Sequence, residues 1–113
     1  MNKKTYSVVK TIDHHSYLWR NNREHNNCAI RCALECCYSL LKSQGYLFLN
    51  QVYQKLGLAS TKEGQTSGWV YDKMHKKDIL WTIWHKNNNE VDAHITFESL
   101  ENILDALPSE EEL

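Results

Sequence analysis

Hydrophobic positions recur with helical spacing through the middle of the first half of the chain. From about residue 27 the apolar positions lie three or four apart and predict one buried helix face: Ile30, Leu34, Cys37 and Leu41. Asn26 or Asn27 can cap the start of this helix, and Gly45 can end it. The same helical spacing predicts a second, short helix that ends at Gly57. Its apolar positions are Leu49, Val52, Tyr53 and Leu56.

Strand-like patterns flank these helices. The first twelve residues contain "TYSVVKTI", which predicts an edge strand, and "DHHSYLWRNNREHNN" predicts a polar loop anchored by Trp19. The turn-rich "ASTKEGQTSG" leads into "WVYD". Farther on, "ILWTIW" and "VDAHITF" predict a hairpin with its turn in the asparagines of "HKNNNE". Its second strand has an apolar face and a polar face: Val91, Ala93, Ile95 and Phe97 against Asp92, His94 and Thr96.

The end of the chain predicts a terminal helix and an acidic tail. Four apolar residues are spaced for a helix that Pro108 closes: Leu100, Ile103, Leu104 and Leu107. The elements together predict an α+β fold, a small antiparallel sheet with about three helices packed on one face. We expect one domain over residues 1–113, with an N-terminal strand and polar loop in 1–26 and an acidic tail in 108–113.

Composition fits a soluble protein of ordinary hydrophobicity. The 113 residues are 42% hydrophobic, too rich for a disordered chain, and their number allows a small core without disulfides. No apolar run is long enough to span a membrane, and the basic N-terminus lacks an apolar signal core. We therefore expect a cytoplasmic protein with reduced thiols and no membrane contact.

The net charge of −1 conceals two oppositely charged parts. Residues 1–89 hold 13 basic and six acidic residues, whereas residues 90–113 hold eight acidic residues and no basic one. The acidic end can simply be solvated. It can also neutralise a basic face of its own domain, or offer carboxylates to a basic partner such as a nucleic-acid-binding surface.

All four cysteines lie in one ten-residue stretch of the first predicted helix, and a helical wheel separates them into two pairs. Cys36 and Cys37 fall beside the apolar face, where free cysteine packs as a small hydrophobe. Cys28 and Cys32 fall among polar residues, where apolar packing does not explain them. Spaced i, i+4, they lie on one face of the helix, as two ligands of a tetrahedral ion would.

Histidines near this pair complete a hypothetical structural zinc site. His25 lies three residues before Cys28, and His14 or His15 can supply a fourth ligand by folding back from the loop. The helix N-terminus favours the thiolate that a metal requires. Paired Cys-x2-Cys knuckles are absent from the sequence. Ordinary packed thiols and a reactive or redox cysteine therefore remain alternatives.

Protein binding is favoured over enzymatic activity. The sequence has no Gly-rich phosphate loop, nucleophile elbow or helix-borne metalloprotease motif. Trp81 and Trp84 alternate in face on one predicted strand, so one of them should lie away from the helices and can anchor an interface. We expect a partner to contact these two rings and four carboxylates: Glu90, Asp92, Glu98 and Glu101. Direct nucleic-acid binding, through Lys73, Lys76 and Lys77, is weakly indicated.

"GYLFLNQVYQKLGL", followed by a loop and "GWVYD", resembles a family of small uncharacterised proteins in phages and mobile elements of Gram-positive bacteria. The resemblance covers about Ala33 to Asp72 and carries no catalytic residues. It implies a small non-enzymatic protein that acts in the host cytoplasm by occluding a larger host machine, most specifically an anti-CRISPR inhibitor of a Cas effector. The alternatives are a structural or assembly accessory of the phage particle and, third, a thiol-dependent enzyme.

Overall fold

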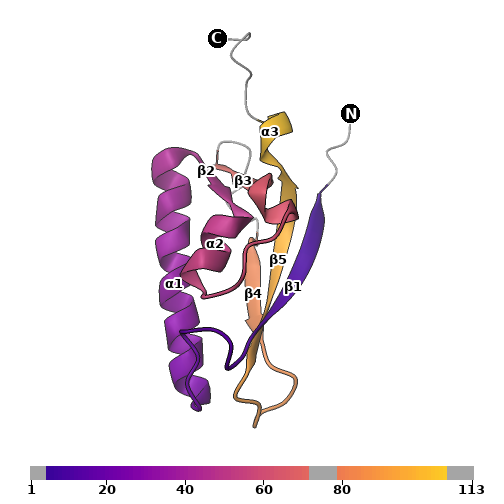
Figure 1. Ribbon diagram of the computed structural model, residues 1–113. Coiled ribbons are helices and arrows are strands. Elements are labelled where there is room, and N and C mark those ends of the chain that lie inside the picture. Colours follow the sequence, from indigo (N-terminus) through magenta and orange to yellow (C-terminus); the bar gives the residue numbers. More distant parts are fainter. Residues whose placement is uncertain (1–4, 72–78, 107–113) are drawn as a thin grey trace.

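The structure is a computed structural model that describes residues 5–71 and 79–106, the last two by backbone alone. Figure 1 shows its elements in chain order: β1 (Tyr6–Ile12), α1 (Arg23–Gln44), β2 (Tyr46–Phe48), α2 (Leu49–Lys55), the 3-10 helix η1 (Glu63–Gln65), β3 (Ser67–Val70), β4 (Trp81–Trp84), β5 (Ala93–Asn102) and α3 (Ile103–Ala106).

The long strand β5 organises one antiparallel sheet. On one side it pairs with β1, and on the other it pairs with β4 over its first half and with β3 near its end. The three-residue strand β2 adds to the outer side of β3. The predicted edge strand and the predicted hairpin are therefore confirmed as β1 and as β4 with β5.

Helices α1 and α2 cover the same face of this sheet (Figure 1), so the predicted α+β class is confirmed. The core between the layers includes the predicted apolar faces of α1, α2 and β5, together with Trp69 of β3. The rings of Tyr53 and Trp69 pack on Phe97 at centroid distances of 5.9 and 6.3 Å. Within the described residues, no helix is long and apolar enough to cross a membrane.

Helix α1 begins four residues earlier than the asparagine pattern suggested. Its cap is Asn22, whose side-chain oxygen accepts the His25 backbone N–H at 2.8 Å. The prediction of Asn26 or Asn27 as the cap is wrong. Asn26 lies inside the helix, 1% exposed, and hydrogen-bonds the preceding loop and the hairpin. Gly45 ends the helix as predicted, at a φ of 87° that favours glycine.

The terminal helix was predicted too early, because a β-bulge imitates helical spacing. Tyr6 pairs with Leu100 and Val8 with Phe97, so β5 contains one residue more than β1, and Ser99 takes a φ of 59°. The extra residue turns Leu100 back into the core, three positions after Phe97. Leu100 is therefore a strand residue and α3 starts at Ile103. The predicted Leu107 and Pro108 lie outside the described residues.

Candidate functional site

The cysteines of α1 separate differently from the prediction. Cys37 is buried as predicted, and burial raises the pKa of its thiol to about 11. Cys36 is exposed, so its assignment to the core is wrong: it lies one helical step beyond the buried stripe. Cys28 and Cys32 are exposed, as their place on the polar edge predicted. The neighbouring Cys28 is the main reason why the pKa of Cys32 is raised.

The predicted zinc ligands are not gathered into one cluster. His25 is exposed in the first turn of α1, on the face that carries Cys28 and Cys32. The His14 ring instead packs on the rings of His15 and Trp19, at 4.0 and 6.4 Å. Zinc binding by this set stays a prediction.

A different group of possible metal ligands lies in the loop before α1. Among the residues described, ligand atoms of Asp13, His14 and His15 lie within 4.8 Å of one another. The Asp13 carboxylate accepts the His15 backbone N–H and meets its Nδ1, both at 3.0 Å. The backbone hydrogen bond is the main cause that lowers the pKa of Asp13. His15 was predicted as an alternative fourth zinc ligand. Its two neighbouring metal-ligating residues are Asp13 and His14, and neither is a cysteine.

Two of the predicted partner-binding carboxylates are engaged within the chain. Asp92 accepts the indole N–H of Trp19 at 2.8 Å, which confirms Trp19 as the anchor of the loop. Glu90 accepts the Lys86 backbone N–H at 2.6 Å and lies 2.9 Å from His94 Nε2. The Lys86 hydrogen bond is the main cause that lowers the pKa of Glu90. These carboxylates hold the hairpin and the loop together.

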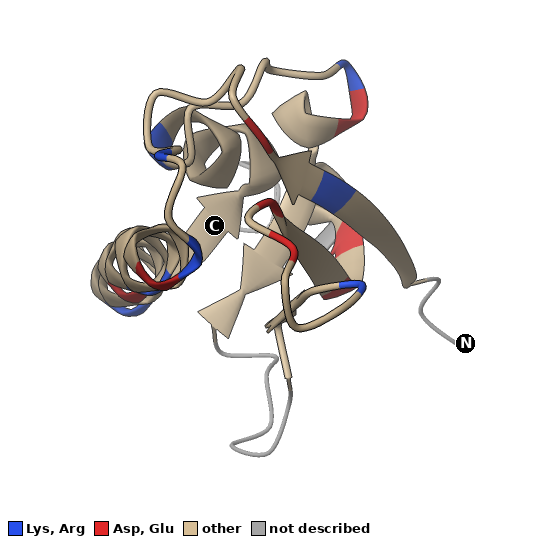
Figure 2. Cartoon of the chain, turned by 90° about the horizontal axis from the view of Figure 1, so that it is seen from below, with Lys and Arg blue, Asp and Glu red and all other residues tan. Residues whose placement is uncertain are grey.

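Charges of both signs lie along α1 (Figure 2), so the imbalance between the two parts of the sequence does not give one basic helix face. Glu98 and Glu101, the other predicted carboxylates, are half-buried on β5. The Glu98 carbonyl accepts the Trp69 indole N–H at 2.8 Å, a contact of its main chain. The acidic tail at 108–113 lies outside the described residues.

A histidine beneath Trp84 joins a hydroxyl to a carboxylate. His94 is 5% exposed, with Nδ1 at 2.9 Å from Thr11 Oγ1 and Nε2 facing Glu90. An ionised carboxylate can only accept, so the proton on Nε2 is donated to Glu90. The indole of Trp84 stacks on this ring at 4.5 Å. Because the indole covers the imidazole, the arrangement suits a structural link better than a general base.

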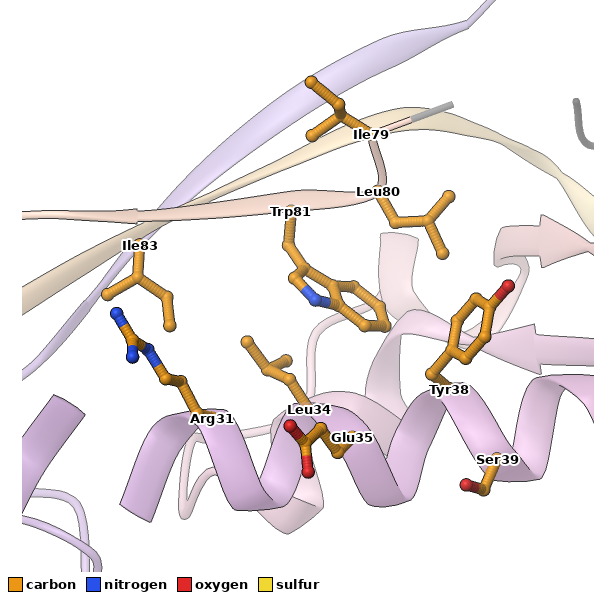
Figure 3. Close-up of a pocket in the computed structure, with 9 residues that line it drawn as sticks. All are labelled: Arg31, Leu34, Glu35, Tyr38, Ser39, Ile79, Leu80, Trp81 and Ile83. Carbon is orange, nitrogen blue, oxygen red and sulfur yellow. The ribbon is translucent and has the colours of Figure 1, made fainter. Parts of the chain in front are cut away.

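A groove with several apolar lining residues lies between α1 and β4, and we call it the α1–β4 groove. It encloses about 650 Å³ and is lined from both sides: Arg31, Leu34, Glu35, Tyr38 and Ser39 of α1, and Ile79, Leu80, Trp81 and Ile83. Trp81 and Ile83 point toward α1, while Leu34 and Tyr38 point toward β4 (Figure 3). Tyr38 and Ile79 are 39% and 61% exposed.

Strand alternation explains why one predicted anchor lines this groove. Exposure alternates along β4, with Trp81 and Ile83 half-buried and Trp84 exposed on the opposite face. The prediction that one of these rings lies away from the helices is confirmed. Tyr38 was not predicted as a site residue, because it falls on the polar side of α1, where a lone aromatic residue is the only signal.

The groove continues past Ile83 into a basic cavity. This second cavity, of about 470 Å³, is lined by Arg31 and Ile83 as well, so the two are contiguous. Its other lining residues are mostly polar and include two further cations: Arg23, Asn27, Trp84, His85, Lys86, Asn87 and Asn88. The Arg23 Nε is buried and has no hydrogen-bond partner within the described chain. An unpaired buried donor of this kind favours an acidic ligand.

Comparison with protein-family models matches residues 2–106 to a family of unknown function, DUF6353. No curated protein and no solved structure gives a significant match.

Proposed function

Since the chain belongs to the DUF6353 family, we propose from its own geometry that it is a non-enzymatic protein-binding domain whose contact surface is the α1–β4 groove. One observation carries this proposal: apolar side chains of Tyr38 and Ile79 stay exposed beside a concave surface. Apolar and aromatic side chains rimmed by charges are typical of interaction sites. Arg31 and Glu35 supply charges of both signs at this rim.

The specific version of this proposal is an inhibitor that blocks a larger host machine, a Cas effector in particular. The resemblance to small phage and mobile-element proteins supports it, and so does the absence of a catalytic motif from the sequence. Opposite charges on the chain and a charged effector would steer the encounter, so binding should weaken with salt.

The alternative is a structural or assembly accessory of a phage particle, stabilised by its own zinc. Residues of metal-ligating types on the loop and on α1 support this version: Asp13, His14, His15, Cys28 and Cys32. Such a component should self-associate or co-purify with virion proteins, whereas an inhibitor should bind a purified effector as a single chain.

The experiment is affinity capture from a bacterial host lysate with two matched variants. Ile79→Glu and Val9→Glu each place a carboxylate on an exposed aliphatic residue, 61% and 52% exposed, and only Ile79 lines the groove. We expect Ile79→Glu to reduce capture of the partner at least about tenfold and Val9→Glu to leave it unchanged. Each identified partner is then purified and titrated against both variants. For a Cas effector, inhibition of target cleavage is measured in parallel.

Two results would contradict the proposal. Equal binding by the two variants would remove the groove from the interface. Recovery of virion proteins alone would contradict the inhibitor proposal and favour the alternative, an assembly accessory of the phage particle.

A further inference from the structure

Within the described residues, strand β4 has one unpaired edge, and it borders the α1–β4 groove. The Glu98 backbone N–H donates to the Leu80 carbonyl at 2.8 Å, so the main chain of Leu80 faces β5. In an antiparallel ladder every second residue directs both of its backbone groups to the same neighbour. Thr82 and Trp84 therefore also face β5, while Trp81 and Ile83 direct their N–H and C=O groups away from it. Within the described residues β4 pairs with no strand but β5.

The side chains beside this edge are arranged for an extended chain. Trp81 and Ile83, whose backbone groups point away from β5, also line the groove, and Tyr38 lines it from α1 (Figure 3). A strand added to β4 would continue the sheet beside α1, with every second side chain directed at this helix. Apolar side chains at those positions would cover Tyr38.

Positive charge at one end of the groove selects for an acidic side chain at the corresponding end of a bound segment. The cavity that continues the groove is lined by three cations, Arg23, Arg31 and Lys86, and by no carboxylate. The unpartnered Arg23 Nε lies at this end. A guanidinium pairs best with a planar carboxylate, because two parallel hydrogen bonds can form. An aspartate or glutamate of the partner segment would pair with the guanidinium groups that line this cavity.

We propose that the free edge of β4 binds an extended segment of a partner protein by strand addition, with alternate apolar side chains in the α1–β4 groove and an acidic side chain at Arg23, Arg31 and Lys86. This inference rests on the proposed function and names the form that the partner takes. The backbone of Trp81 and Ile83 supplies the hydrogen bonds, and the groove and the three cations supply the selectivity.

The test uses proline to remove one outward N–H. Ile83→Pro deletes a donor that β5 does not use, and edge strands tolerate proline at such positions. Ile83→Ala removes the same side chain but keeps the N–H, so the difference between the two variants isolates the backbone bond. Val9→Pro is the matched control on β1: Val9 pairs with Thr96, which faces β4, so the Val9 N–H also points outward.

The probe is a displayed library of random linear peptides, selected on the full-length wild-type chain. We expect selected peptides to be rich in alternating apolar residues, acidic at one end and free of proline in the centre. Synthetic copies should bind Ile83→Pro at least about tenfold more weakly than Ile83→Ala, and Val9→Pro like the wild type. Arg23→Gln should reduce the preference for the acidic end. Circular dichroism of each variant checks that it is folded.

Failure of strand addition and failure of the proposed function are distinguishable. Helical binders, equal affinities of Ile83→Pro and Ile83→Ala, or no enriched peptide would overturn strand addition. In each of those cases a partner captured from the lysate that still loses affinity for Ile79→Glu would leave the protein-binding function standing. Selection of the chain's own C-terminal sequence would identify a second copy as the occupant and overturn the assignment to a foreign partner.

Discussion

Replacing Asn26 by alanine should destabilise the protein far more than any other asparagine change in the same loop and helix start. The Asn26 side chain accepts the Arg20 N–H at 2.7 Å and donates to the carbonyls of Arg20 and Val91 at 2.8 and 3.0 Å. It therefore ties the loop, the first turn of α1 and the β4–β5 hairpin to one another. The substitution removes all three bonds and fills no space in return.

The expected cost follows from these three bonds. Each contributes about 1 kcal/mol net, so their loss costs about 3 kcal/mol. Alanine recovers about 0.5 kcal/mol through its higher helix propensity, which leaves about 2.5 kcal/mol. For a chain of 113 residues this corresponds to a fall in Tm of about 10 °C.

Urea and thermal unfolding followed by circular dichroism measure this loss. Asn21→Ala is the control: Asn21 is exposed, and no side-chain bond of Asn21 occurs in the described chain. It should change stability by less than about 0.5 kcal/mol. A loss below about 1 kcal/mol for Asn26→Ala, or equal losses for the two variants, would refute the assignment of Asn26 as the link between loop, helix and hairpin.

Four further outcomes are expected. Gly68→Ala should lower the urea midpoint by the equivalent of about 3 kcal/mol or more, because the new Cβ would clash with the Leu47 carbonyl oxygen of β2. A wild-type midpoint would contradict this close approach. The lowered pKa of Glu90 contributes stability that is present above the ordinary pKa of 4.5 and is lost as pH falls. Glu90→Gln should therefore flatten the acid side of a curve of Tm against pH. An unchanged slope would contradict this contribution of Glu90. At pH 8 a thiol reagent should modify three cysteines quickly and Cys37, with its pKa of about 11, only after unfolding; four fast thiols would place Cys37 at the surface. Elemental analysis should find zinc that the double change Cys28→Ala, Cys32→Ala removes, and a zinc-free wild-type protein would end the zinc hypothesis.

The sequence predicted elements wherever one periodicity held over several turns or strand residues. The stripe of Ile30, Leu34 and Leu41 and the alternation of Ala93, Ile95 and Phe97 both report which face is buried, and both are confirmed. The β5 bulge broke the strand period, so Leu100 fell into helical spacing and was assigned to the wrong element. Strand β2, of three residues, is too short to show a period and went unpredicted.

The candidate site could be predicted only in part. Trp81 was selected as a partner-binding residue and does line the groove, because alternation along a strand is visible in sequence. The groove itself depends on how α1 lies against the free edge of β4, a long-range arrangement that no local pattern encodes. The same is true of Asn26, whose partners at Arg20 and Val91 lie on other elements. Local asparagine statistics therefore suggested a cap where the structure has a tertiary link.

Hydrogen exchange at the β4 edge tests the central claim most directly. The chain is compared free and bound to the partner identified by capture, with residue-resolved exchange of the Trp81 and Ile83 amides, which face away from β5. We expect both amides to exchange at least about tenfold more slowly in the complex, together with protection across residues 31–39 of α1. Unchanged exchange at these amides, with protection confined to β1 around Val9, would contradict binding in the α1–β4 groove.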